Sequence, residues 1–219
     1  MALGINIEKI KQEGLEVDLK RLSREGYYAI PKDDFYRLKL HGICSQRHEG
    51  FFMLRHRIGG GRIDPDQMEV LCDLAAQYAS GYVHLTSRQN VELHSITIEK
   101  VPDILERLEK AALSTRSSCG HTFRNVMGTP CSGTCAHELV DIRPWVSAVS
   151  RMVIKSSEYY NPRLPKRLNV SFSGCACGAD YALIDTAQAF SHGQRKNFFQ
   201  NRSSKAKTQR SAVRRLKKV

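Results

Sequence analysis

The sequence predicts an α+β fold in which helices cover one face of a sheet, and three observations support this prediction. Short alternating runs typical of strands and longer runs with helical periodicity follow one another over residues 51–113. Hydrophobic residues make up 41% and charged residues 26% of the 219-residue chain, which are ordinary values for a globular protein. Since no apolar run approaches the roughly 20 residues of a membrane-spanning helix, an integral membrane protein is excluded.

The first elements are a lead-in and two expected strands. Residues 1–35 are expected to form a helical, peripheral lead-in, because their apolar residues recur at loosely helical spacing that Gly14 interrupts. Residues 36–42 alternate apolar and polar side chains, which favours a short strand. A stronger strand is expected at 51–58, closed by three glycines at 59–61. These glycines lack the lysine and hydroxyl residue of a phosphate-binding loop, so we interpret them as a turn that passes close to another group.

The next elements complete a familiar order. A helix is expected over 65–80, two short strands over 82–86 and 90–96, and a second helix from Pro102. A proline at the start and a glycine after the end are typical of helix boundaries. The order strand, helix, strands, helix is that of a ferredoxin-like layer, with a sheet on one side and helices on the other. Residues 36–113 are therefore predicted to be a ferredoxin-like half-domain.

The second half of the chain is less regular. Residues 114–136 are too polar and too rich in glycine to predict regular structure, whereas 137–160 have a helical pattern and 168–172 that of a strand. We assign 114–190 to a second, partial α/β domain. The remainder, residues 191–219, has no apolar stripe and is expected to be a solvated coil or a marginal helix.

The net charge is concentrated at one end of the chain. The chain has 34 basic and 22 acidic residues, a net charge of +12, which as a bulk number suggests an anionic partner such as nucleic acid. Residues 191–219 hold ten Lys or Arg and no acid, so residues 1–190 are close to neutral. Nucleic-acid binding through this tail is one hypothesis, but the body has no recognisable nucleic-acid module. The N-terminus lacks a secretory signal, so we expect a cytoplasmic protein.

Basic residues recur where the predicted elements end. Arg55 and Arg57 are two apart, so both point to one face of their strand. The other positions are Arg88, the Arg124–Asn125 pair, and the Lys166–Arg167 pair. Each alone is typical of a solvated surface charge, but arginines on a sheet face cost free energy unless they meet an anion. If the arginines converge, their guanidinium groups would hold a polyanionic ligand.

Seven cysteines allow two interpretations. Five of them lie between 119 and 177, and they can be free, buried thiols in a reducing compartment. The close pairs Cys131–Cys135 and Cys175–Cys177 also suggest metal or cluster ligands. A cysteine and histidine zinc module without a redox role is a further hypothesis.

Four segments resemble motifs of the nitrite and sulfite reductase hemoproteins. Residues 51–61 resemble the "LR-x-R-x-x-GG" strand and turn, and residues 85–94 are similar to "LT-x-RQ-x-x-x-x-H". Residues 119–126 resemble "CGD-x-x-RNV", and residues 164–175 resemble "LPRKFK-x-x-x-SGC". The four motifs follow in the family's order over residues 36–187, so the resemblance does not depend on any one of them.

The resemblance implies cofactors and roles. Members of this family bind sirohaem, a haem-like ring rich in carboxylates, beside a 4Fe–4S cluster, and they receive electrons from a donor protein or subunit to reduce nitrite or sulfite. It implies a sirohaem-binding second domain and cofactor contacts from Arg55, Arg57, Arg88, Arg124, Asn125, Lys166 and Arg167. Arg55, Arg88, Arg124 and Lys166 are the implied catalytic residues. Cys131, Cys135, Cys175 and Cys177 are the candidate metal ligands.

The sequence also departs from the family. The resemblance covers the first half of the family's chain, which implies a half-length reductase that pairs with a second-half chain or with itself; a non-catalytic fragment is the alternative. The family takes its cluster cysteines from the second half, at different spacings. Asn169 stands at the last basic position of the fourth motif. The abrupt change of composition leads to the hypothesis that residues 191–219 are an aberrant or frame-shifted end.

Overall fold

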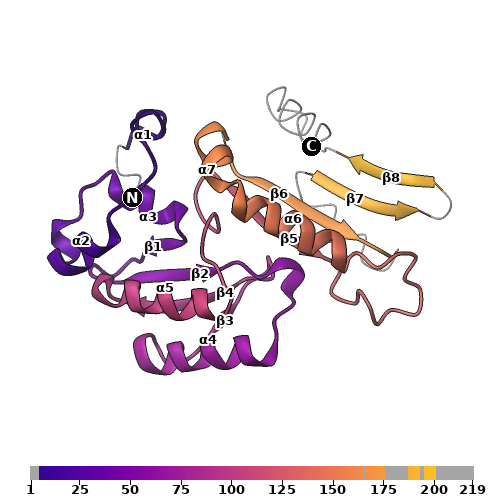
Figure 1. The fold of residues 1–219 in the computed structure, drawn as a ribbon, viewed down its shortest axis with the longest axis horizontal. Helices are drawn as coiled ribbons and strands as arrows, with labels where there is room; N and C mark the ends of the chain where they lie inside the picture. Colours follow the sequence, from indigo (N-terminus) through magenta and orange to yellow (C-terminus); the bar gives the residue numbers. More distant parts are fainter. Residues whose placement is uncertain (1–4, 165, 176–186, 193–194, 201–219) are drawn as a thin grey trace.

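The computed structural model describes residues 5–164, 166–175, 187–192 and 195–200. They form two four-stranded sheets, each accompanied by its own helices (Figure 1). Among these residues, no helix has the length and apolar character needed to cross a membrane.

The first sheet has the architecture expected of residues 36–113. Its strand order is β1-β2-β4-β3, with antiparallel pairing throughout. The strands are β1 (Ile43–Ser45), β2 (Phe52–His56), β3 (His84–Leu85) and β4 (Val91–Ile96). Helices α4 (Pro65–Tyr78) and α5 (Val101–Lys110) pack beside it (Figure 1). The α+β prediction is confirmed.

The main core is built from the inward side chains of this sheet and of its two helices. Fully buried members are Phe52, Leu54, Leu71, Leu74, Leu93, Ile104 and Leu108. The predicted helical spacing of α4 and α5 places their buried residues on one face, which is why both helices could be located from the sequence.

The N-terminal lead-in is helical but not wholly peripheral. It contains α1 (Ile7–Glu13) and α2 (Leu19–Glu25), and Gly14 caps α1 at the predicted interruption. Leu22 of α2 is fully buried and belongs to the main core. The lead-in therefore contributes to the stability of the first domain.

The alternation at 36–42 predicts a strand, but the structure has a helix there, α3 (Asp34–Leu40). Leu38 packs in the main core, whereas Tyr36 and Leu40 pack against α1 in a separate small cluster. A helix buried on two sides produces the same alternation of apolar residues as a half-buried strand, which is why the prediction was wrong.

The second sheet has the order β5-β6-β7-β8, in which the first three strands are parallel and β8 is antiparallel to β7. The strands are β5 (Phe123–Gly128), β6 (Leu168–Ser173), β7 (Ala187–His192) and β8 (Arg195–Gln200). The chain connects β5 to β6 through α6 (Arg143–Lys155), α7 (Ser157–Tyr160) and a short 3-10 helix, η4 (Asn161–Arg163). A strand, helix, strand unit of this kind agrees with the predicted α/β character.

Two strands occur where the composition predicts none. β5 lies in the polar stretch 114–136, and it forms because Phe123 and Val126 are buried in the core cluster under α6. β8 lies in the tail expected to be coil or helix. Most of that tail lies outside the described residues, so its proposed origin and its affinity for nucleic acid stay predictions.

The three glycines at 59–61 do pass close to another element, as predicted. They form the short 3-10 helix η2 (Gly59–Gly61). A Cβ on Gly59 would lie 2.6 Å from Ser150 Oγ of α6, and a Cβ on Gly128 would lie 3.6 Å from the Cα of Gly60. Absence of a side chain therefore lets the first domain pack directly against β5 and α6.

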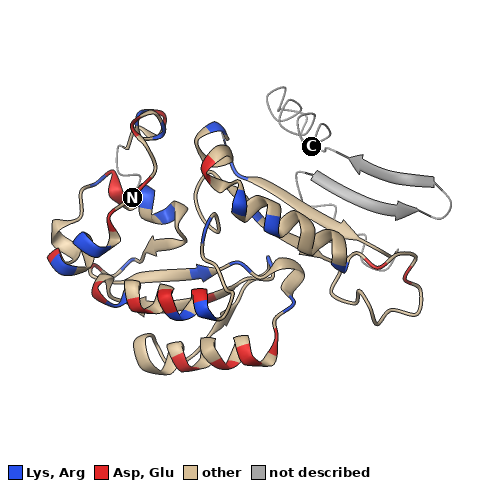
Figure 2. Ribbon diagram, viewed as in Figure 1, with Lys and Arg blue, Asp and Glu red and all other residues tan. Residues whose placement is uncertain are grey.

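Two helices, one from each domain, differ in the sign of their charge (Figure 2). α4 carries Asp66, Glu69 and Asp73 and no basic residue. α6 carries basic residues and no acidic residue. The near-neutral charge of residues 1–190 is therefore a sum of local charges of opposite sign.

Candidate functional site

One backbone carbonyl, that of Ser118, brings two of the predicted arginines together. Arg55 lies on β2 and Arg124 on β5, and their Nη1 atoms donate to the Ser118 oxygen at 3.5 Å and 2.6 Å. Ser118 is held in place because its Oγ donates to the Arg55 carbonyl at 2.8 Å. Guanidinium groups from two domains therefore meet at one oxygen, which residue spacing alone could not show.

The two guanidinium groups differ in their partners. Arg55 Nε donates to Glu92 Oε1 at 2.6 Å. Burial tends to lower the pKa of Arg55, but the charges of Cys119 and Glu92 outweigh it, so this pKa is raised. Arg124 has no carboxylate partner among the described residues, and its buried Nε has no hydrogen-bond partner. Burial, with the nearby charges of Arg55 and Arg167, lowers its pKa. Arg124 thus offers a buried N–H donor for an anion.

Two thiols supply an internal anion that sequence reasoning missed. Cys44 on β1 and Cys119 before β5 are both buried. A hydrogen bond from Cys44 lowers the pKa of Cys119 to about 6; burial opposes this shift, and Arg55 and Arg124 add to it. The same hydrogen bond, together with burial, raises the pKa of Cys44. The lowered pKa favours the thiolate form of Cys119, which would balance part of the arginine charge. The available signal was the place of Cys119 in the third motif, five residues before Arg124.

Glu92 is a second residue that sequence reasoning did not single out. It is 5% exposed, and besides Arg55 it contacts His84 Nδ1 at 3.5 Å and His94 Nε2 at 3.3 Å. Glu92 and His94 lie two apart on β4, and His84 is the cross-strand partner of Glu92. The carboxylate therefore fixes Arg55 from the sheet side of the site.

Arg57 approaches the same segment as Arg55 but is used differently. It is 4% exposed. Its guanidinium donates to four backbone carbonyl oxygens, those of Arg116 at 3.4 Å, Ser117 at 3.0 Å, Arg124 at 3.0 Å, and Phe123. Burial, and secondarily Arg124, lowers its pKa. These bonds do not support the expected role of Arg57 as a cofactor ligand, because its donors already join β2 to the segment that leads into β5.

Arg88 and Asn125 meet on the other side of β5. Arg88 is half-buried in the loop between β3 and β4, as predicted, with Nη1 3.7 Å from Met127 Sδ. Asn125 is 1% exposed, and its Nδ2 donates to the carbonyls of Ile58 at 2.7 Å and Arg88 at 2.9 Å. Asn125 therefore anchors the Arg88 loop to β5, while its own Oδ1 is buried without a partner.

Lys166 and Arg167 are exposed and lie before β6. The charge of Arg167 contributes to the lowered pKa of Arg124. Burial is the main cause of the lowered pKa of His121, and the charge of Lys166 adds to it. The charge of Arg167 therefore acts on Arg124, and that of Lys166 acts on His121. Asn169, where the family motif has a basic residue, is 7% exposed with a buried Oδ1 that lacks a partner.

Three of the four predicted metal ligands come together. The sulfur atoms of Cys131, Cys135 and Cys175 all lie within 4.8 Å of one another, and Cys131 Sγ is 3.6 Å from Cys175 Sγ. Cys177 lies outside the described residues. The Cys131–Cys135 pair and Cys175 therefore belong to a single thiol group.

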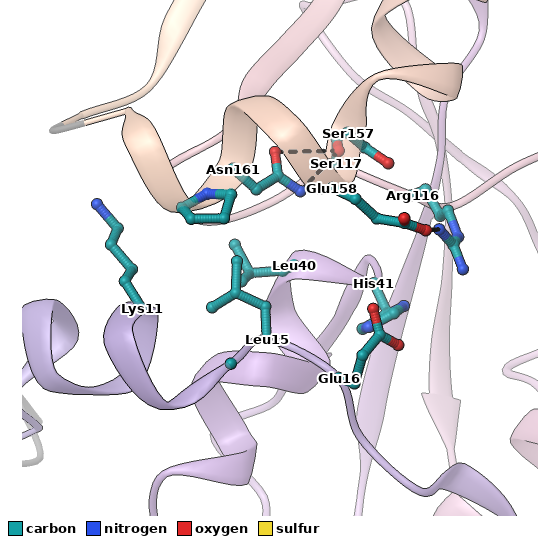
Figure 3. A pocket seen from close by; sticks show the side chains of 12 residues that line it. Lys11, Leu15, Glu16, Leu40, His41, Arg116, Ser117, Ser157, Glu158 and Asn161 are labelled. Atoms are coloured by element: carbon teal, nitrogen blue, oxygen red, sulfur yellow. Dashed lines mark hydrogen bonds and ion pairs between the residues drawn. The ribbon is translucent and has the colours of Figure 1, made fainter.

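Two cavities lie apart from these arginines. One, of about 130 Å³, lies between α1, α3 and α7, where Asn161 bonds to Ser117 and Arg116 pairs with Glu158 (Figure 3). The other, of about 640 Å³, lies between η2, the end of β5 and the start of α6. Arg55, Arg88 and Arg124 line neither of these two, so the arginine site lies at the junction of the domains and not in these hollows.

Comparison with known families identifies both domains. The ferredoxin-like half domain of nitrite and sulfite reductases matches residues 45–111, and the nitrite and sulphite reductase 4Fe–4S domain matches residues 119–185. The first match covers most of the first sheet, and the second match covers strands β5 and β6 of the second sheet.

Curated relatives and a solved structure agree with these matches. The chain is 32% identical over 177 residues to the assimilatory ferredoxin-dependent nitrite reductase of Haloferax mediterranei, covering 74% of this chain and 30% of that protein. It is 35% identical over 188 residues to the ferredoxin–nitrite reductase of Leptolyngbya laminosa, covering 81% of this chain and 37% of the relative. The chain thus spans about a third of the length of these relatives. The fold matches the Mycobacterium tuberculosis NirA protein with a TM-score of 0.79 and 24% identity, over 89% of this chain and 40% of that one.

Proposed function

Since the chain belongs to the nitrite and sulfite reductase family, we propose that its cationic site binds the carboxylates of sirohaem and the small oxyanion that is reduced there. The cationic site is defined as Arg55, Arg88, Arg124, Lys166 and Arg167. Guanidinium groups form paired, charge-assisted hydrogen bonds with carboxylates, and they are suited to a ring that carries many of them.

The observation that supports this proposal best is the meeting of Arg55 and Arg124 at the Ser118 carbonyl. A carbonyl dipole neutralises two full positive charges only in part, and the buried Nε of Arg124 still lacks a partner. An unsatisfied buried donor costs about 1–3 kcal/mol, which an incoming carboxylate would recover. The donors present therefore fit sirohaem.

Each basic residue has a defined part in the proposed reaction. Sirohaem, when bound, supplies electrons to the oxyanion. The Arg55 guanidinium is oriented by Glu92, and Asn125 anchors the backbone of Arg88, so both residues would present positive charge to an anion. Reduction of nitrite or sulfite consumes protons, and guanidinium groups keep theirs. Lys166, the one cation of the site that is not a guanidinium, is therefore the proposed proton donor.

The proposed partners follow from the relatives and from the length of the chain. Two of the matched nitrite reductases are named for ferredoxin, so we propose a ferredoxin-type electron donor. Since this chain covers only 30% and 37% of those relatives, we propose that the domains described here act together with a second-half chain or a second copy. The oxyanion can be nitrite or sulfite, since the same donors suit both.

Sirohaem binding tests the proposal directly. The full chain, produced in cells that make sirohaem, is expected to retain the chromophore, measured by visible absorption and iron content. Loss of one charge-assisted hydrogen bond, about 1.5–3 kcal/mol, predicts that Arg124→Met binds sirohaem about 10- to 150-fold more weakly. Arg151→Met is the matched control, since Arg151 is exposed on α6. A colourless wild-type chain, or equal sirohaem content in Arg124→Met, would contradict the proposal.

A further inference from the structure

The thiol group Cys131, Cys135 and Cys175 is organised by its own local structure, separately from the cationic site. Cys131 and Cys135 are joined by a tight turn, in which the Cys135 amide donates to the Cys131 carbonyl at 3.0 Å and Gly133 has φ +84°. Their sulfur atoms lie within 4.8 Å of each other, so this turn brings both thiols to the same side. The metal-ligand interpretation of this pair required that geometry.

Glu138 fixes the turn that carries these thiols. Its Oε1 accepts a hydrogen bond from Ser132 Oγ at 2.5 Å, and its Oε2 accepts one from the Gly133 amide at 2.7 Å. Groups that orient the loop around a ligand set are typical of metal sites, where they pre-organise the ligands.

Gly174 brings the third thiol to the same place. The amides of Leu139 and Val140 donate to the Gly174 carbonyl at 2.8 Å and 3.3 Å. A Cβ at Gly174 would lie 2.2 Å from the Val140 carbonyl oxygen, so no other residue fits without a shift of the backbone. This close approach positions Cys175, which is 4% exposed, beside Cys131.

The spacing of the sulfur atoms distinguishes two kinds of metal centre. Two zinc–sulfur bonds of about 2.3 Å that meet at a tetrahedral angle place their sulfurs about 3.8 Å apart. The 3.6 Å separation of Cys131 and Cys175, and the 4.8 Å limit for the whole group, agree with this value. In a 4Fe–4S cluster each thiolate binds a different iron, so the sulfurs are separated by the width of the cluster as well. The described thiols therefore do not fit a 4Fe–4S cluster.

We propose that Cys131, Cys135 and Cys175 bind a single tetrahedral thiophilic ion of the Zn²⁺ class. Three thiolates fill three positions of a tetrahedral site, and a fourth ligand, from the chain or from water, completes it. The ion joins the turn after β5 to the end of β6 and stabilises the second domain. This site is independent of sirohaem binding, so either proposal can fail while the other stands.

Metal titration of the full chain tests the site. After removal of metal under reducing conditions, the chain is expected to bind one equivalent of Co²⁺, with a thiolate-to-cobalt charge-transfer absorption, and to release it to Zn²⁺. Cys131→Ser and Cys175→Ser are expected to lose this absorption. Cys72→Ser is the matched control, since Cys72 is exposed on α4 in the first domain, and it should behave as wild type.

A second measurement on the wild type avoids any dependence on the folding of the variants. Zn²⁺ is expected to protect Cys131, Cys135 and Cys175 from alkylation, located by peptide mass spectrometry, and to leave Cys72 reactive. Three outcomes would overturn the proposal: no bound Co²⁺; a Cys131–Cys175 disulfide in place of metal; or reconstitution with iron and sulfide that gives about four irons and four labile sulfides per chain through these cysteines.

Discussion

Replacement of Arg57 is expected to destabilise the fold strongly, although the residue belongs to a cofactor-binding motif by resemblance. Arg57 is 4% exposed and its guanidinium is bonded to four carbonyls. Arg57→Met keeps much of the side-chain volume and removes every donor. It therefore tests whether Arg57 stabilises the contact between the domains or is available to bind a ligand.

The expected magnitude follows from the partners. A hydrogen bond from a charged donor to a carbonyl contributes about 1.5–3 kcal/mol. The contact with Arg116, at 3.4 Å, is long, and the Ser117 oxygen keeps a second donor in Thr122 Oγ1 at 2.7 Å. Only the hydrogen bonds to the Phe123 and Arg124 carbonyls are therefore counted at their full strength. Their loss in Arg57→Met is expected to lower the free energy of unfolding by about 3–6 kcal/mol.

Urea unfolding followed by circular dichroism measures this free energy, provided that the slope with denaturant stays unchanged. Arg57→Lys should be destabilised nearly as much, because a single ammonium cannot span the four carbonyls. The control, Arg151→Ala, should stay within about 0.5 kcal/mol of wild type. If the free energy of unfolding of Arg57→Met lies within about 1 kcal/mol of the wild-type value, the hydrogen bonds to the carbonyls do not hold the domains together. A cofactor-binding role of Arg57 would then be favoured again.

Two further predictions concern the segment around Ser118. Because the pKa of Cys119 is lowered to about 6 and that of Cys44 is raised, the folded chain has lost one proton that the unfolded chain keeps between about pH 6 and pH 8.5. The free energy of unfolding is therefore expected to rise with pH over that window. It should fall at higher pH, because there the unfolded chain loses the protons of both thiols. The urea midpoint, measured against pH, should pass through a maximum in the wild type and not in Cys119→Ser. Gly42 has φ +80°, and a Cβ there would lie 2.3 Å from the Thr115 carbonyl oxygen. In the same unfolding assay, Gly42→Ala should therefore lower the free energy of unfolding by more than the roughly 1–2 kcal/mol of left-handed backbone strain alone. Gly50→Ala, at φ +86° in open space, is its control and should cost about that strain and no more; equal losses in the two variants would contradict the close contact.

The helices that could be predicted from the sequence are those that bury a single face in a single hydrophobic core. α4 and α5 bury one stripe each, and their periodicity was sufficient. α3 and β5 could not be predicted. α3 is buried on two sides, which imitates a strand. β5 contains Asn125, whose amide nitrogen donates to carbonyls of distant loops, and no local sequence pattern predicts such partners.

The same reasoning applies to the candidate site. Sequence could place Arg55 and Arg57 on one side of a strand, and both do reach the segment before β5. It could not tell them apart, because the difference lies in the backbone conformation of residues 116–124, which turns four carbonyls toward Arg57. The motif match ranks the two equally, whereas their hydrogen bonds differ: Arg57 donates to four backbone carbonyls, and Arg55 donates to Glu92 and to the Ser118 carbonyl.

The charge that matters for an anion is set by local neutralisation, not by the net charge of the chain. Arg55 is paired with Glu92 at 2.6 Å, and the charges of Arg55 and Arg124 help to lower the pKa of Cys119. Only part of the positive charge at the Ser118 carbonyl is therefore balanced by nearby negative groups. The imbalance is greatest at Arg124, because burial and two neighbouring guanidinium groups lower its pKa. An anion placed there would reverse that shift and raise the pKa of Arg124. The proposed anion would therefore be favoured most on the β5 side, where the second domain begins and the positive charge is least balanced.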